Sequence, residues 1–134
     1  MTLFEFNRSQ IEGLKRYIYH SDIHDSKIDA WNYDREKRIL NIKTVNPIFG
    51  TQMNLTFKEV IIFLSISGNE IGARETILSL TVEEDYSYFQ NCTQVCGECF
   101  GDSLYLLFQM FSGDELHIVS KSVVIFTTQL IPRA

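Results

Sequence analysis

The sequence lacks the features on which several functional classes depend. Its 12 lysines and arginines are outnumbered by 17 aspartates and glutamates, which leaves a formal net charge of −5. Nucleic-acid binding through phosphate neutralisation needs a basic face, so this balance disfavours it. Apolar runs are no longer than stretches such as VIIFL at 60–64, far below the roughly 20 residues of a membrane-spanning helix. We therefore expect neither nucleic acid nor a membrane as a partner.

Motifs of the common catalytic and secretory classes are also missing. The opening residues MTLFEFNRSQ are too polar for a signal peptide, so we expect a cytoplasmic protein. The chain contains no glycine-rich phosphate-binding loop and no nucleophile elbow. No motif therefore supports catalysis; we favour a protein that is not an enzyme, and we expect no cofactor.

One amphipathic helix is expected near the N-terminus, over about residues 8–19. Asn7 and Gln10 have the spacing of a capping box, and Leu14 and Ile18 recur on one face of the helix.

The chain after this helix alternates short β-like runs with turn residues. The runs are 27–34, 39–45, 51–57, 59–66, 75–83, 103–111 and 116–128. A single helix cannot supply the crossovers of a parallel sheet. The sequence therefore predicts one α+β domain over 1–134, with about six to eight antiparallel strands in a sandwich or partial barrel and one N-terminal helix.

Three details of this sheet follow from the pattern. A tight turn at Lys58 and Glu59 is expected to separate two strands. The run 103–111 is apolar on both faces and should be a central strand. The segments 61–71 and 106–116 align without a gap, which indicates either a duplicated half-domain or two similar turns.

The stretch EEDYSYF, which we call the acidic–aromatic segment (83–89), combines carboxylates with aromatic rings. Aromatic side chains anchor protein partners, and carboxylates steer a basic partner toward the surface. The ordinary alternative is a solvated strand end. We expect this segment to bind a protein of basic charge, through Glu83, Glu84, Asp85, Tyr86, Tyr88 and Phe89.

Three cysteines follow this segment in the pattern C-x3-C-x2-C, at Cys92, Cys96 and Cys99. The spacing resembles the iron–sulfur loop of radical-SAM enzymes, and CGEC resembles a thioredoxin-type dithiol, but neither fold context is present. A zinc site would need a histidine as its fourth ligand. A small metal or redox protein is therefore the alternative hypothesis, against free thiols as the ordinary interpretation.

The stretch YHSDIHDSKI (19–28) also has the composition of a metal site, because His20 and His24 are four residues apart. However, it lacks the glutamate of a zinc-enzyme HExxH motif, and Ser21 and Asp22 favour turns and caps. We interpret it as a polar corner in which side chains bond to the backbone where a helix ends and a strand begins.

The segment IHDSKIDAWNYDREKRILNIKTVNP (23–47) resembles the opening of small uncharacterised bacterial proteins that begin a β-domain with His-Asp-Ser-x-Ile. Some of these look like immunity proteins encoded beside polymorphic toxins. The resemblance implies a protein-binding role and assigns no functional residue; the cysteine-rich loop is not part of its pattern. The leading hypothesis is therefore a protein-binding module, an immunity-type inhibitor of a toxin.

A third hypothesis is a small-ligand binder. Its pocket would lie inside the partial barrel and be lined by Trp31, Tyr105, Phe108 and Phe126.

Overall fold

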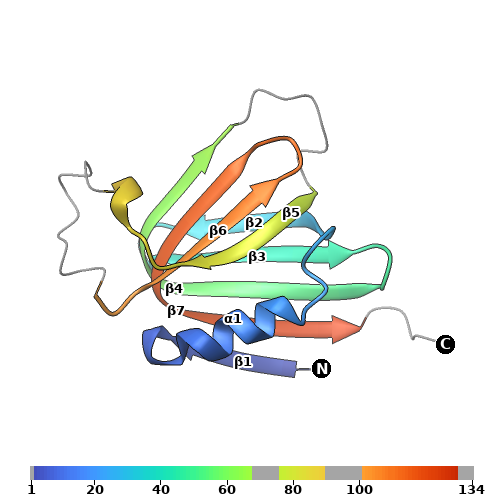
Figure 1. Ribbon diagram of the computed structural model, residues 1–134, viewed down its shortest axis with the longest axis horizontal. Coiled ribbons are helices and arrows are strands. Elements are labelled where there is room, and N and C mark those ends of the chain that lie inside the picture. Colours follow the sequence, from blue (N-terminus) through green and yellow to red (C-terminus); the bar gives the residue numbers. More distant parts are fainter. Residues whose placement is uncertain (1, 68–75, 90–100, 130–134) are drawn as a thin grey trace.

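A computed structural model describes residues 2–67, 76–89 and 101–129 of the chain (Figure 1). Its strands pair antiparallel in a seven-stranded sheet that is not closed into a barrel, with a helix near the N-terminus, so the predicted α+β class is confirmed. The elements are β1 (Thr2–Asn7), the 3-10 helix η1 (Arg8–Gln10), α1 (Ile11–Tyr19), β2 (Lys27–Asp34), β3 (Ile39–Asn46), β4 (Thr51–Ile66), β5 (Ile77–Glu83), the 3-10 helix η2 (Ser87–Phe89), β6 (Leu104–Met110) and β7 (Glu115–Gln129).

The long strand β7 organises the sheet, whose order is β2-β3-β4-β7-β6-β5. On one side it pairs with β4 along almost its whole length. On its other side, residues 115–120 pair with β6 and residues 122–127 pair with β1. Figure 1 shows the long strands running along the base of the molecule and then turning upward. The sheet is therefore bent, with β1, β2 and β3 on one arm and β5 and β6 on the other.

The prediction of a tight turn at Lys58 and Glu59 is wrong. β4 runs through these residues as one strand, with a register shift between Val60 and Ile62. Glu59 has a φ of 51°, in the left-handed region, which is typical of a bulge. The continuous partner β7 holds both halves of β4 in register, so the chain bends at this point and does not reverse.

The N-terminal helix forms as predicted, and a strand that the sequence analysis missed precedes it. The Asn7 side chain accepts the Ser9 N–H at 3.0 Å, and the Gln10 side chain accepts the Asn7 N–H at 3.0 Å. This capping box begins η1, which leads into α1. Residues 2–7 form β1 because β7 offers them a free edge, and nothing local in their sequence indicates that partner.

The main core fills the concave side of the bent sheet, and α1 packs into it through Leu14 and Ile18. Its fully buried large side chains include Leu14, Leu40, Ile42, Leu55, Phe57, Ile77, Leu104, Leu106, Phe108, Ile118 and Ile125. A second, smaller cluster lies on the opposite face of the sheet and contains Phe89, Tyr105, Leu107 and Val119. Both faces of β6 are therefore covered, as predicted for the run 103–111.

The edge strands β2 and β5 approach each other at one end. Lys27 and Thr76 form an isolated bridge. Beside it, the Asp25 N–H donates to the Ile77 carbonyl at 3.0 Å, and the Ile77 N–H donates to the Ser26 carbonyl at 2.8 Å. The polar corner between α1 and β2 is thus bonded to the beginning of β5.

The two similar segments of the sequence have different surroundings. The described part of 61–71 belongs to β4, which pairs with β3 and β7 and not with β5, the next strand in the chain. In contrast, 106–110 belongs to β6, which forms a hairpin with β7. The arrangement does not support a duplicated half-domain. Among the described residues, no helix is long and apolar enough to cross a membrane.

Replacing Phe108 with alanine should destabilise the protein strongly, because its ring is fully buried in the main core. We expect a loss of about 3–5 kcal/mol in the free energy of unfolding, measured by urea denaturation. Phe111→Ala is the matched control, since Phe111 is exposed, and should cost within about 0.5 kcal/mol. Equal losses in the two variants would show that β6 does not carry the core.

Candidate functional site

The described part of the acidic–aromatic segment combines buried and exposed side chains. Glu83 ends β5, and Ser87–Phe89 form η2. Phe89 is buried and Tyr86 is half-buried, while Glu84, Asp85 and Tyr88 are exposed. Phe89, which was expected to contact a partner, is thus not accessible at the surface, and partner binding by the segment stays a prediction. The Phe89 ring packs at a centroid distance of 5.0 Å from Tyr105, because β6 and β7 present an apolar outer face at this point.

Tyr86 fastens the segment to two other parts of the chain. Its hydroxyl donates to the Ser103 carbonyl at 3.0 Å. The Arg8 guanidinium donates through Nη1 to both the Tyr86 hydroxyl, at 3.1 Å, and the Ser103 carbonyl, at 3.2 Å. These bonds connect η1, the acidic–aromatic segment and the start of β6, so the segment is held at both Tyr86 and Phe89.

The carboxylates of the segment have separate local partners. Glu84 forms an ion pair with Lys15 of α1, with 3.3 Å between Oε2 and Nζ. Asp85 accepts the Ser87 N–H at 2.9 Å, and this bond, together with the Ser87 hydroxyl, lowers the pKa of Asp85. Both Ser87 groups favour the charged form of Asp85. Because Glu84 and Asp85 have separate partners, they suit a charged surface and not a pair of carboxylates that exchanges a proton.

Beneath the segment lies a chain of polar groups that the sequence analysis missed. The Tyr105 hydroxyl is 2.5 Å from Nδ1 of His117, and Nε2 of His117 is 3.1 Å from Oε1 of Glu115. Tyr88 stacks on His117, with 4.6 Å between ring centroids and 10° between planes. Tyr105 and His117 are both 3% exposed. The hairpin register makes them diagonal neighbours across β6 and β7, which is the signal that could have revealed the pair.

The proton positions in this chain follow from Tyr105. Burial, and after it the negative charges of Glu83 and Glu115, raise the pKa of Tyr105 to about 12. The phenol therefore keeps its proton. When it donates to Nδ1 of a neutral His117, Nε2 of the same ring carries the hydrogen that is donated to Glu115. The Tyr105 hydroxyl is buried under the acidic–aromatic segment. Its contact with His117 joins β6 to β7, and the His117 ring supports Tyr88. The chain of polar groups does not present a reactive group.

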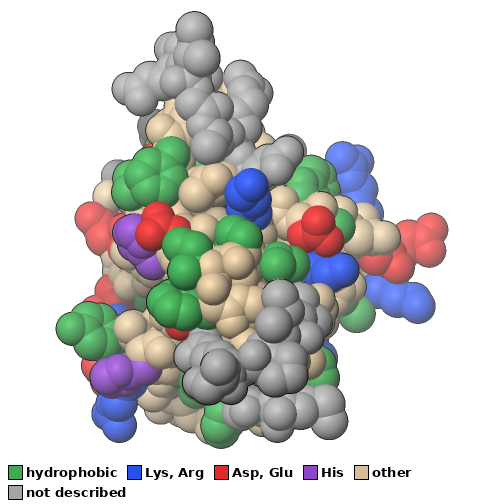
Figure 2. Space-filling model, turned by 90° about the vertical axis from the view of Figure 1, so that its right-hand side faces the viewer, with side chains coloured by type: hydrophobic (Ala, Val, Ile, Leu, Met, Phe, Trp, Pro, Cys, Tyr) green, Lys and Arg blue, Asp and Glu red, His purple; other side chains and the backbone are tan. Residues whose placement is uncertain are grey.

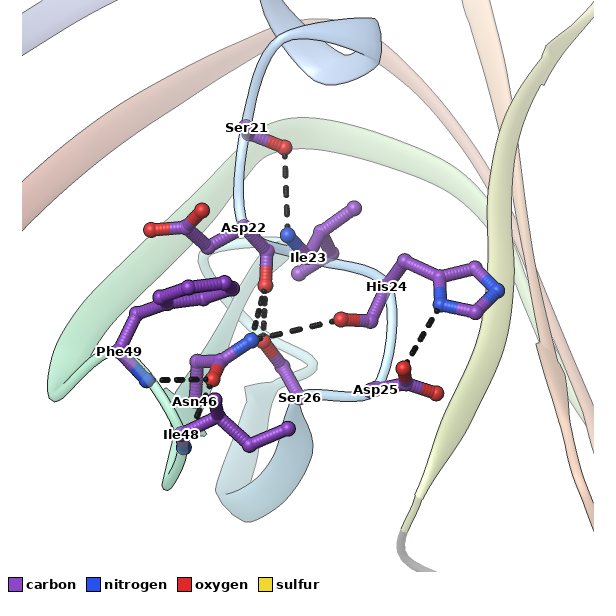
Figure 3. Close-up of polar contacts among 9 residues, drawn as sticks. All are labelled: Ser21, Asp22, Ile23, His24, Asp25, Ser26, Asn46, Ile48 and Phe49. Atoms are coloured by element: carbon purple, nitrogen blue, oxygen red, sulfur yellow. Dashed lines mark hydrogen bonds and ion pairs between the residues drawn. The ribbon is translucent and has the colours of Figure 1, made fainter.

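The histidine-containing stretch is the polar corner that its composition indicated. The Ser21 hydroxyl donates to the Ile18 carbonyl at 2.7 Å. The Ser26 hydroxyl donates to the Asp22 carbonyl. His24 is exposed; its Nδ1 lies 3.2 Å from Oδ2 of its neighbour Asp25, and its ring lies edge-on to that of Phe111. In Figure 3 the Asp22 carboxylate and the His24 ring point in different directions.

Asn46, at the end of β3, holds this corner together and was not anticipated. Its Nδ2 donates to the Asp22 carbonyl at 2.8 Å and to the His24 carbonyl at 3.4 Å. Its Oδ1 accepts the N–H groups of Ile48 and Phe49, at 2.9 and 3.0 Å (Figure 3). One buried amide thus joins the loop before β2 to the turn after β3.

Metal binding has no support in the described part of the chain, where no three His, Cys, Asp or Glu side chains lie close enough to hold an ion. Cys92, Cys96 and Cys99 lie outside the described residues, so the metal or redox hypothesis for that loop stays a prediction.

The predicted aromatic pocket does not form. Phe108 lies in the main core and Tyr105 in the cluster on the opposite face of the sheet. Trp31 is exposed on the edge strand β2, where its ring packs against Phe63. Trp31 and Phe126 line one surface hollow, which Tyr105 and Phe108 do not reach. Tyr105 and Phe108 point to opposite faces of β6, so the four proposed residues do not line one cavity.

Comparison with known proteins yields no match to a family model, a curated protein sequence or a solved structure.

Replacing Tyr105 with phenylalanine should change how stability depends on alkaline pH. Unfolded tyrosine loses its proton near pH 10, while folded Tyr105 keeps it to about pH 12, so unfolding releases a proton in this window. The stabilising contribution of Tyr105 is therefore full below pH 10 and is lost as pH rises to about 12. Urea unfolding across this range should show a steeper fall for the wild type than for Tyr105→Phe. The exposed-site control Tyr19→Phe should keep the wild-type slope; a wild-type slope in Tyr105→Phe would contradict the assignment.

Replacing Asn46 with aspartate should destabilise the corner, since a carboxylate cannot donate to the Asp22 and His24 carbonyls. We expect a cost of about 1–3 kcal/mol in urea denaturation. Asn41→Asp is the control, because Asn41 is exposed and only accepts a bond, from the Thr56 hydroxyl at 2.7 Å. Identical unfolding midpoints for the two variants would rule out the role given to Asn46.

Proposed function

We propose that this protein is a non-enzymatic protein-binding module that engages a basic partner through the acidic–aromatic segment. The observation that carries the proposal is how Tyr88 is held. Its ring stacks on the buried His117 and yet remains 53% exposed, between residues that are anchored on both sides.

A tyrosine held in this way is suited to anchor a partner. Tyrosine contributes a large contact area with few rotatable bonds, and it is enriched among the residues that dominate binding energy. The stack on His117 already orients the ring of Tyr88, so binding would order less of the side chain. The partner would contact the free face of the ring.

The negative charge around Tyr88 favours a partner of basic charge. Glu84 and Asp85 are exposed beside it, and the whole chain carries a net charge of −5. Acidic groups at the rim of an interface raise the association rate with a basic protein and make that rate sensitive to salt. Lys15 offsets part of the charge of Glu84, so Asp85 contributes the less compensated negative charge.

The class of partner is suggested by the resemblance of residues 23–47 to small uncharacterised bacterial proteins, some of which look like immunity proteins. An immunity protein inhibits a toxin by binding to it, and this protein would act in the same way. The resembling segment forms the polar corner and the β2–β3 hairpin, on the other arm of the sheet from η2. It would support the fold, while the acidic–aromatic segment would make the contact.

Reversing the charges of Glu84 and Asp85 to lysine should remove binding of the partner. Proteins of the source cell would be captured on immobilised wild type and variant and compared by quantitative mass spectrometry. Glu5→Lys with Glu36→Lys is the matched control, because it changes the same charge at exposed sites elsewhere, and Glu5 pairs with Lys58 as Glu84 pairs with Lys15. A basic protein that is retained by the control and lost from E84K/D85K is expected.

Tyr88→Ala should then weaken that complex by more than about 1 kcal/mol, measured by titration calorimetry, while the unfolding midpoint changes little. If the reversed variant retains the same proteins as the control, with the same salt dependence, the interface lies elsewhere.

A further inference from the structure

A cavity of about 540 Å³ lies between α1, β1 and the inner face of the sheet. This volume falls within the range of sites that bind small molecules. The cavity lies toward the end of the molecule where α1 ends and β3 turns into β4, the end shown in Figure 2. Its described lining residues are Phe4, Phe6, Gly13, Arg16, Tyr17, His20, Ser21, Asp22, Ser26, Thr44, Thr51, Met53 and Thr127.

A glycine in the helix leaves this space open. Gly13 lies in the middle of α1, although glycine is a poor helix former. A Cβ added there would be 3.7 Å from Cε1 of Phe6, an ordinary contact, so close packing does not require glycine. Gly13, Arg16, Tyr17 and His20 share one face of the helix by their spacing, and that face lines the cavity.

The lining of the cavity contains apolar side chains and hydroxyl groups. Phe4, Phe6 and Met53 supply apolar surface. The hydroxyls of the lining already have partners. Thr44 donates to the Met53 carbonyl at 3.0 Å, and Ser26 donates to the Asp22 carbonyl. The other bonds are from Ser21 to the Ile18 carbonyl, from Thr51 to Asp22, and between Tyr17 and Thr127. These groups are satisfied without a ligand.

Arg16 and His20 are the basic groups of the lining, and both are exposed at the end of α1. Among the described residues, no carboxylate lies within ion-pair distance of Arg16. Asp22 also lines the cavity, and its Oδ2 accepts the Thr51 hydroxyl at 3.1 Å. This bond leaves the carboxylate charged, so an anion in the cavity has to be held by Arg16 and His20 against that repulsion. The C-terminal end of a helix disfavours an anion, whereas a guanidinium binds a carboxylate through paired charge-assisted hydrogen bonds, which are the stronger effect.

We propose that this cavity binds a small carboxylic acid with an apolar body. The hydrocarbon part lies against Phe4, Phe6 and Met53, and the carboxylate accepts hydrogen bonds from Arg16 and His20. The imidazole of His20 can donate an N–H in either protonation state. The site is separate from the acidic–aromatic segment, so the proposal does not depend on the proposed function.

The test uses decanoate, with decan-1-ol as a probe of the same chain length without charge. Binding is followed by ¹H–¹⁵N NMR titration of the full chain. Wild type should bind decanoate roughly tenfold more tightly than decanol, because the charge-assisted bonds are absent for the alcohol. Amide shifts should concentrate at Gly13, Arg16, Thr44 and Met53 and spare residues 83–89.

Two variants separate the parts of the site. Arg16→Gln should remove the preference for decanoate and leave decanol binding unchanged, whereas the control Arg35→Gln, in the turn after β2, should behave as wild type. Gly13→Leu should fill the cavity and weaken both probes roughly tenfold or more, with the folded spectrum retained.

Three results would overturn the proposal: no saturable decanoate binding, shifts centred away from the cavity, or an unchanged preference in Arg16→Gln. Should Gly13→Leu fail to fold, the amide shifts of the wild type and the Arg16→Gln titration decide the question.

Discussion

The pairing of β7 with three other strands is the constraint on which the rest of the structure depends. β7 binds β4 along one side, and it binds β6 and then β1 along the other. Each of these partners lies far from β7 in the sequence except β6. Pairing strands that are far apart in the sequence requires a large loss of chain entropy before the stabilising contacts form. The sheet therefore completes only when the last described strand is in place, and β1 has no partner until then.

The bend in β4 and β7 gives the sheet a concave face and an outer face, and each face carries one candidate binding region. On the concave side, α1 and the inner face enclose the main core and the cavity beside Arg16. On the outer face, the same bend exposes β6 and β7, which η2 covers through Phe89 and Tyr88. The two candidate binding regions thus belong to the two faces of one bent sheet. They face opposite sides of the sheet, so occupancy of one does not block the other.

Local signals predicted the parts of this fold that are built locally. The capping box at Asn7 and Gln10 marked the helix, and alternation with turn residues marked the β2–β3 and β6–β7 hairpins. β1 and the continuity of β4 could not be predicted, because both depend on β7 as a distant partner. The burial of Phe89 and the bond between Tyr105 and His117 depend in turn on strand register, which composition does not reveal. The acidic–aromatic segment was found from its residue types, but which of its side chains face solvent was not.

The contact between the polar corner and β5 covers part of a sheet edge that could otherwise pair with another chain. An edge strand offers unpaired N–H and C=O groups to any passing chain, which is a common route to aggregation. Here the backbone of Asp25 and Ser26 occupies the groups of Ile77, and Lys27 and Thr76 pair beside them. The beginning of β5 is therefore closed to a foreign strand, and the charged side chain of Lys27 stands at the rim. The polar corner, whose composition resembles a metal site, therefore covers part of the edge of the sheet.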